Sequence, residues 1–111
     1  HSVETWVQDE LVGGLYFVAV GKAVFGESMF SLAPDASKLA LAALIAICRD
    51  QGISLVDCQQ NTRHLASLGA REMDRSHLLA HVRSAIGDPS PQWRFEPTLW
   101  RLILKPEPVI A

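Results

Sequence analysis

A stretch that is apolar on nearly every face constrains the fold of this chain more than any other feature. It runs from Leu39 to Cys48 within a segment that predicts a helix, with Asp35 as its N-cap, Asp50 near its end and Gly52 just beyond it. A helix without a polar face must be buried on more than one side. The stretch is about half as long as the ~20 residues of a membrane-spanning helix, so we expect no membrane segment.

Runs typical of strands lie on both sides of this helix. His1–Val7, Glu10–Val20 and Ala23–Phe30 precede it, and Ile53–Gln59 follows it. Gly13-Gly14 predicts a bulge or a close approach of another segment. The sequence therefore predicts an α/β fold of the α+β type, with a mixed sheet in which an antiparallel meander is followed by a βαβ unit. The GNAT fold of N-acetyltransferases has the same order, although a fold alone does not determine function.

The rest of the chain predicts shorter elements around the same single domain. Asn61 or Thr62 can cap a short helix that ends near Gly69, and residues 75–86 have apolar positions at helical spacing. After a proline-rich loop, the apolar run 102–104 predicts a last strand. A chain of 111 residues fits one domain.

Charge and cysteine content limit the classes of function. Residues 1–60 carry three basic and seven acidic side chains, a net −4, whereas residues 61–111 carry seven basic and five acidic ones, a net +2. A protein that binds nucleic acid unaided usually has a clearer basic excess. Cys48 and Cys58 lie in apolar surroundings, which is typical of reduced thiols in a cytoplasmic protein.

Asp57 is the first candidate for chemistry. Side chains alternate along a strand, so Asp57 and Gln59 share one face and Cys58 lies on the other. Burial of a carboxylate costs several kcal/mol (roughly) unless it is paired, so Asp57 needs a functional or structural partner. The structural interpretation is that it caps the helix after Thr62 or pairs with Arg63.

Glu27 is the second candidate, because it lies inside an apolar strand. On alternation alone, Phe25 and Met29 share its face. An acid between apolar side chains suits a cation beside an apolar pocket, whereas the alternative is a strand-edge glutamate that points to water. Met29 and Phe30 are more often core residues than pocket residues.

The positions of the cysteines and histidines disfavour two other kinds of site, a thiol nucleophile and a zinc site. Cys58 faces away from Asp57 and nothing positions His64 against it, so a buried, inert thiol is favoured over a nucleophile. His77 and His81 stand four apart without the glutamate of a zinc motif, and we expect them to face solvent. We expect no metal.

The junction before the long helix argues against a coenzyme A enzyme. Acyl-CoA-binding members of the GNAT fold have a glycine-rich loop there, whose N–H groups hold the pyrophosphate. Here the junction is Ser31-Leu32-Ala33-Pro34-Asp35-Ala36-Ser37, without a glycine and with an aspartate that would repel phosphate. We expect no cofactor.

Five short segments together resemble leucyl/phenylalanyl-tRNA–protein transferase, the bacterial family of the N-degron pathway of protein degradation. They stand in family order: Val12-Gly13-Gly14-Leu15-Tyr16, Phe25-Gly26-Glu27-Ser28-Met29-Phe30-Ser31, Ala36-Ser37-Lys38, Val56-Asp57-Cys58-Gln59 and residues 64–72. The resemblance implies transfer of Leu or Phe from aminoacyl-tRNA to the α-amino group of proteins that begin with Arg or Lys. It also implies that neither metal nor coenzyme A is needed. We expect a monomer.

The resemblance also implies roles for individual residues. Asp57 polarises Gln59, and the carbonyl oxygen of Gln59 draws the proton from the attacking amine. Glu27 contacts the basic N-terminal residue or the amine. The wall of the Leu/Phe pocket would be formed by Leu15, Tyr16, Phe25 and Met29.

Members of this family are about twice as long as the present chain. The resemblance therefore implies that residues 1–111 are the C-terminal catalytic domain, that an N-terminal domain is missing, and that the fragment alone is weak or inactive. The alternatives are an acyl-CoA-dependent N-acetyltransferase of the same fold and a non-catalytic module that recognises basic N-termini.

Overall fold

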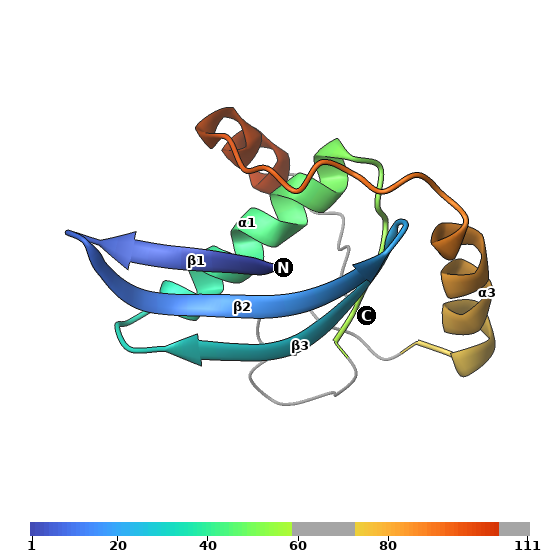
Figure 1. Cartoon of the computed structure of the whole chain (residues 1–111), viewed down its shortest axis with the longest axis horizontal. Coiled ribbons are helices and arrows are strands. Elements are labelled where there is room, and N and C mark those ends of the chain that lie inside the picture. Colours follow the sequence, from blue (N-terminus) through green and yellow to red (C-terminus); the bar gives the residue numbers. More distant parts are fainter. Residues whose placement is uncertain (59–72, 105–111) are drawn as a thin grey trace.

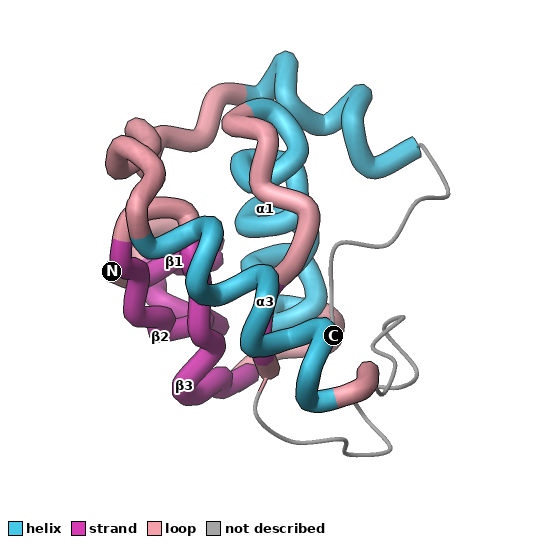
Figure 2. Tube along the Cα trace, turned by 90° about the vertical axis from the view of Figure 1, so that its right-hand side faces the viewer, coloured by secondary structure: helices cyan, strands magenta, loops and turns pink. Residues whose placement is uncertain are grey.

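The computed structural model describes residues 1–58 and 73–104. In this part of the chain, a four-stranded sheet is covered on one face by the long helix α1 (Ala36–Asp50), while a second helix, α3 (Arg75–Ile86), lies beside the sheet (Figure 1). The view at right angles shows α1 and the sheet as separate layers (Figure 2). The expected α+β architecture with a mixed sheet is confirmed.

The four strands follow one another in the sheet in the order of the sequence: β1 (Ser2–Val7), β2 (Glu10–Val20), β3 (Ala23–Ser31) and β4 (Val56–Asp57). β1, β2 and β3 pair antiparallel, and β3 pairs with β4 in parallel. The meander and the parallel pair after the helix are therefore confirmed. β4 begins later than predicted, because the N–H of Ile53 donates back to Cys48 and closes the end of α1.

Two turns explain why the meander forms. Gln8 and Asp9 both have positive φ, 48° and 67°, as the two central residues of a tight hairpin turn require. Gly21 has a φ of 57° in the next turn, where a Cβ would also lie only 2.6 Å from the carbonyl oxygen of Ala85. The N–H of Lys22 donates to that same oxygen, so this turn attaches α3 to the sheet.

The end of α1 is closed by a backbone motif around Gly52. The N–H of Ile53 donates to the carbonyl oxygen of Cys48 at 2.7 Å, and the N–H of Gly52 donates to that of Arg49 at 3.4 Å. Gly52 has a φ of 73°. These are the bonds of a Schellman motif, and the predicted glycine stop is confirmed.

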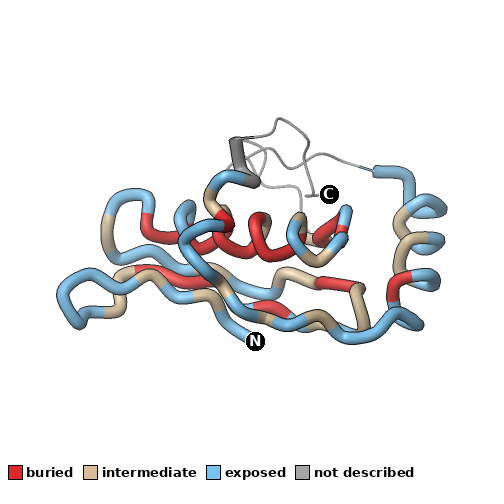
Figure 3. The backbone as a smooth tube through the Cα atoms, turned by 90° about the horizontal axis from the view of Figure 1, so that it is seen from above, coloured by how far each residue is buried: buried red, intermediate tan, exposed pale blue. Residues whose placement is uncertain are grey.

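The core lies between α1 and the sheet, where Figure 3 shows an almost continuous buried stripe along the helix. Phe17, Val24 and Val56 from the strands meet Leu41 and Leu44 from the helix, and each is at most 3% exposed. The helix is also buried on a second side, as its sequence predicts. Ala46 and Ile47 pack there against Leu99.

Leu99 belongs to the 3-10 helix η1 (Pro97–Leu104), where the sequence had indicated a strand at 102–104. That prediction is wrong. Three apolar residues in a row do not distinguish a strand from a helix. The deciding contacts lie upstream, where the N–H of Leu99 donates to the carbonyl oxygen of Glu96 and the Leu99 side chain packs on α1.

The helix predicted at 75–86 is confirmed as α3, but its histidines differ from each other. His77 is exposed as expected, whereas His81 is half-buried. The Nε2 atom of His81 is buried and has no hydrogen-bond partner in the described part of the chain. The short helix predicted at 61–69 lies outside the described residues. No described helix is long and apolar enough to cross a membrane.

Candidate functional site

The predicted chemical groups gather where β3 and β4 separate. The two strands pair in parallel only through Val24–Val56 and Phe25–Asp57. Asp57 is half-buried at the last of these pairs, and Glu27 is exposed two residues beyond Phe25. Gln59 lies outside the described residues. The two acids of the prediction therefore lie at the same end of neighbouring strands, where ligands of α/β proteins often bind.

A β-bulge carries Glu27. Tyr16 on β2 pairs with Ser28, and the next residue, Phe17, pairs with Gly26, so Glu27 is the extra residue on β3. Bulges of this kind redirect a side chain and are common next to active sites. A second bulge lies at Val12, where Thr5 pairs with Gly13 but Trp6 pairs with Leu11. The prediction at Gly13-Gly14 was a bulge or a close approach, and the close approach is confirmed, because a Cβ on Gly13 would lie 2.5 Å from the Cβ of Ala36.

The bulge at Glu27 changes which predicted pocket residues lie together. Met29 pairs with Leu15, which is 5% exposed and faces α1. Phe25 pairs with Val18, which is 37% exposed on the opposite face. The expectation that Phe25 and Met29 share a face is therefore wrong, because strict alternation ends at the extra residue.

The predicted wall consequently divides into two pairs. Leu15 and Met29 lie on the helix-covered face, and Met29 packs against the core. Phe25 lies on the other face, on the side where Tyr16 is 49% exposed. The role of each pair in binding an amino-acid side chain stays a prediction.

Asp57 lies on the sheet face opposite α1. Its neighbour Val56 is 1% exposed and belongs to the core beneath the helix, as does Val24 opposite it. Because side chains alternate along a strand, Asp57 and its partner Phe25 lie on the other face. Cys58 packs against the core, so Asp57 and Cys58 point apart as the sequence indicates.

Both cysteines are free thiols held in the protonated form. Burial raises the pKa of the Cys48 thiol to about 12. Burial, and to a smaller extent the negative charge of Asp57, raises the pKa of the Cys58 thiol to about 11. Since the thiolate is the nucleophile, neither side chain is activated for covalent catalysis at neutral pH.

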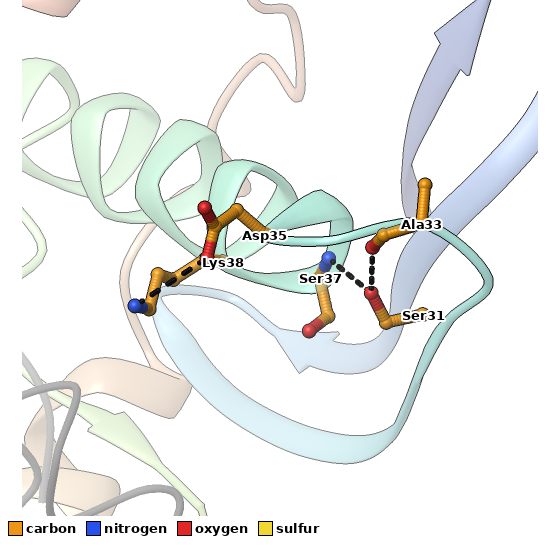
Figure 4. A network of polar contacts seen from close by, with 5 residues as sticks. All are labelled: Ser31, Ala33, Asp35, Ser37 and Lys38. Carbon is orange, nitrogen blue, oxygen red and sulfur yellow. Dashed lines mark hydrogen bonds and ion pairs between the residues drawn. The ribbon is translucent and has the colours of Figure 1, made fainter.

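The N-terminus of α1 is already closed by the protein itself (Figure 4). Asp35 precedes the helix with a φ of 62° and makes no side-chain cap, although the sequence had predicted one. Instead its carboxylate pairs with Lys38 at 3.6 Å, and the N–H of Ser37 donates to Oγ of Ser31 at 3.3 Å. Ser31 is thus the residue that accepts from the first turn, and the prediction for Asp35 is wrong in this respect.

A cavity of about 430 Å³ lies at the other side of the sheet, next to β1. The rings of His1 and Phe17 stack at 5.3 Å, and Trp93 meets the Phe17 ring edge-on at 4.9 Å. The cavity is lined by residues 1–6, the aromatic side chains Phe17, Trp93, Phe95 and Trp100, and the α1 residues Leu39, Ala40, Ala43 and Ile47. None of the predicted site residues that the structure describes lines it. In the sequence, the tryptophans of the tail were the one feature that pointed to this cavity.

In the described ranges, no three His, Cys, Asp or Glu side chains come together as metal ligands. The candidate site therefore consists of the Asp57 carboxylate and Glu27 on the bulge of β3. Leu15 and Met29 lie on the helix-covered face of the sheet, and Phe25 and Tyr16 lie on the opposite face.

Comparison with known proteins identifies the family. The family model for leucyl/phenylalanyl-tRNA protein transferase matches residues 1–83. The leucyl/phenylalanyl-tRNA–protein transferase of Polaromonas sp. is 57% identical over 107 residues, which are 96% of this chain and 42% of that protein. The enzymes of the same name from Albidiferax ferrireducens and Burkholderia orbicola are 58% and 51% identical, over 96% and 100% of this chain and 42% and 44% of their own lengths. The chain spans less than half the length of these relatives, and it belongs to the leucyl/phenylalanyl-tRNA–protein transferase family.

Proposed function

We propose that this chain carries the acyl-transfer site of a leucyl/phenylalanyl-tRNA–protein transferase. In this proposal, Leu or Phe moves from aminoacyl-tRNA to the α-amino group of a protein that begins with Arg or Lys, in the N-degron pathway of the bacterial cytoplasm. The observation that carries it is the half-buried carboxylate of Asp57 at the open end of the β3–β4 pair, in a chain of this family.

The proposed reaction is aminolysis of an ester. The acceptor nitrogen attacks the carbonyl carbon of the aminoacyl ester, the C–O bond to the tRNA ribose breaks, and the ribose oxygen leaves as a hydroxyl after it takes up a proton. A free α-amino group has a pKa of about 7.7–8.0, so part of it is already neutral at physiological pH. Most of the rate enhancement must then come from positioning rather than from a strong base.

Asp57 suits the role of a group that polarises the base. It lies at the end of a strand buried on the Val56 side and is itself accessible in part. We propose that it orients and polarises Gln59, whose carbonyl oxygen accepts the amine proton as the C–N bond forms. Loss of general-base assistance typically lowers a rate by about 10²–10⁴-fold.

Glu27 suits recognition of the basic acceptor. Glu27 is exposed on the bulge of β3. It lies two residues beyond Phe25, the residue that pairs with Asp57 on β4. A carboxylate there attracts the Arg or Lys side chain or the α-ammonium group. The apolar pair Leu15 and Met29, with Phe25 and Tyr16 on the other face, would contact the Leu or Phe side chain.

We further propose that the fold is GNAT-like and that the rest of a polypeptide of the relatives' length completes it. The divergence of β3 and β4 after two pairs supports a ligand site between them. The cavity beside β1 and the exposed side chains of Trp6, Tyr16 and Phe30 support a covering segment, because single domains rarely leave such surfaces open. On this basis the present chain alone transfers weakly, and the complete enzyme acts as a monomer.

The decisive experiment uses the natural polypeptide that carries this chain, radiolabelled Leu-tRNA and a peptide that begins with Arg. We expect labelled peptide from the wild type and a loss of about 10²–10⁴-fold in rate with Asp57→Asn. Asp35→Asn is the matched control, because it makes the same change on an aspartate that is paired with Lys38 on the surface. Binding of the peptide without transfer would instead support a recognition module.

A coenzyme A titration tests the remaining alternative. An acyl-CoA enzyme would be stabilised against heat by saturating coenzyme A, because ligands that bind only the native state raise its melting temperature. We expect no shift, since the N-terminus of α1 presents the Asp35 carboxylate and the N–H of Ser37 already has a partner.

A further inference from the structure

The face of the sheet opposite α1 carries apolar side chains where a solvated sheet would carry polar ones. On β2, Leu15 and Phe17 belong to the core beneath the helix. The alternate residues Tyr16, Val18 and Val20 therefore face away from it, and they are 49%, 37% and 46% exposed. An antiparallel sheet with one face in water usually has polar residues at such positions, so this pattern indicates a face that is covered in the complete protein.

The neighbouring strands extend this apolar surface. Phe30 on β3 pairs with Gly14, and a Cβ on that glycine would lie 2.9 Å from its ring. On β1, Nε1 of Trp6 donates to the carboxylate of Glu4, the residue that pairs with Gly14 from the other side. The two aromatic side chains are 44% and 55% exposed. We call the whole surface the outer stripe; it consists of Trp6, Tyr16, Val18, Val20 and Phe30. Exposed apolar surfaces of this kind mark interaction sites.

In the described part of the chain, no helix lies over the outer stripe. Figure 1 looks onto this face of the sheet, with α1 behind the strands and α3 beside them. The stripe follows β2 from Gly14 to Val20, which is about 20 Å at roughly 3.3 Å per residue. A helix rises about 1.5 Å per residue, so a helix of about 13 residues has the length of the stripe.

The charged side chains that face outward with the stripe are acidic. Glu4 lies beside it on β1. Asp57 pairs with Phe25, which pairs in turn with Val18, so two strand spacings of about 4.8 Å separate Asp57 from the stripe. A second copy of the same face would bring like charges together, whereas a segment with basic residues would complement them.

We propose that an amphipathic helix of about 13 residues, from the part of the natural polypeptide outside residues 1–111, covers the outer stripe with its apolar face. This rests on the proposed function, in which that part completes the fold. The matched relatives have more than half of their length outside the shared region, which is ample for such a helix. The helix carries Lys or Arg where it approaches Glu4 and Asp57. Since a helix is about 10 Å wide, it also bounds the candidate site on the Asp57 side.

Cysteine alkylation in the natural polypeptide tests whether the outer stripe is covered. Val18→Cys and Val20→Cys should react with a maleimide at least tenfold more slowly than Leu32→Cys, the matched control, whose native side chain is 77% exposed just beyond β3. The reaction is measured at each site by mass spectrometry of peptides, which separates it from any reaction at Cys48 and Cys58. A smaller difference would overturn the proposal.

Photo-cross-linking identifies what covers the stripe. The photoreactive p-benzoylphenylalanine replaces Tyr16, and we expect a cross-link to a peptide of the same molecule outside residues 1–111, with apolar residues at helical spacing and with Lys or Arg. A cross-link to residues 59–72 or 105–111, a cross-link between two molecules, or no cross-link would each contradict the proposal. Neither measurement requires transfer. The inference therefore stands if a covered stripe is found in a protein that transfers nothing, and it falls if an active enzyme leaves the stripe open.

Discussion

The two sides of the sheet carry different properties. Beside β1, the aromatic rings of His1, Phe17 and Trp93 line a cavity of about 430 Å³, and none of the candidate residues that the structure describes lies there. Where the pairing of β3 and β4 ends, by contrast, lie Asp57 and Glu27, the two residues for which we propose chemical roles. The apolar cavity is the usual first choice for a binding site. In this chain, the cavity and the candidate reactive groups lie in different places, so on our proposal the cavity does not locate the reaction.

The largest expected effect tests whether the β1 side is structural. Phe17→Ala should lower the free energy of unfolding by about 3–5 kcal/mol, because the ring is 1% exposed and contacts both His1 and Trp93. Phe25→Ala, on the half-buried side of β3, should lose less than half as much. Urea denaturation of both variants measures the difference, and equal losses would contradict the division between the two sides.

The next effect concerns the thiol beside Asp57. At pH 8, Cys58 should react with iodoacetamide about 100-fold more slowly than a free thiol, since its pKa is raised from 9.0 to about 11. The kinetics of alkylation in the native protein, with a cysteine peptide as the reference, measure this. A rate within tenfold of the peptide would mean that the β3–β4 opening exposes the thiolate.

The same pKa predicts the direction of a pH effect on stability. Below pH 9 the thiol is protonated in both the folded and the unfolded chain, and its contribution is complete. As pH rises from 9 to about 11, the unfolded chain loses the proton first, so the free energy of unfolding falls. Cys58→Ala should flatten this part of the profile, and an unchanged profile would exclude Cys58 as its source.

A smaller effect should distinguish the acidic residue Glu27 on β3 from the acidic residue Glu4 on β1. Glu27→Gln should raise KM for an Arg peptide about tenfold, because one charge–charge contact with the acceptor is lost. Glu4→Gln on β1 is the matched control, since Glu4 accepts hydrogen bonds only from the local Ser2 and Trp6 side chains in the described structure. Equal effects of the two variants on KM would remove Glu27 from the acceptor site.

The smallest expected effect lies at the N-terminus of α1. Lys38→Met removes an ion pair with Asp35 whose side chains are 55% and 72% exposed, and it should change stability by less than about 0.5 kcal/mol. Thermal denaturation at low and high salt checks this. A loss above 1 kcal/mol would show that this terminus contributes to holding the helix on the sheet.

The sequence predicted the ends of β1, β2 and β3, and the helices α1 and α3, closely, because hydrophobic alternation and the Gly52 stop are local signals. The faces of β3 could not be predicted in the same way. Glu27 is an extra residue because its two neighbours on β3 pair with Tyr16 and Phe17, which are adjacent on β2. Alternation along β3 alone carries no information about this pairing.

The candidate site was predicted unevenly for the same reason. The motifs located Asp57 and Glu27 at one end of the parallel pair, but they did not separate Met29 from Phe25. The tail was wrongly predicted as a strand, since its helical form depends on the packing of Leu99 against Ala46 and Ile47. The capping role of Ser31 was likewise missed, because it depends on how the chain enters α1.

The paired glycines of β2 have a consequence for how relatives of this chain can diverge. Gly13 accommodates Ala36 on one face, and Gly14 accommodates the ring of Phe30 on the other. A Cβ at position 13 would also lie only 2.7 Å from the backbone carbonyl carbon of Ala36, so a smaller residue at position 36 would not make room for it. We therefore expect relatives to keep glycine at position 13 whatever residue stands at position 36.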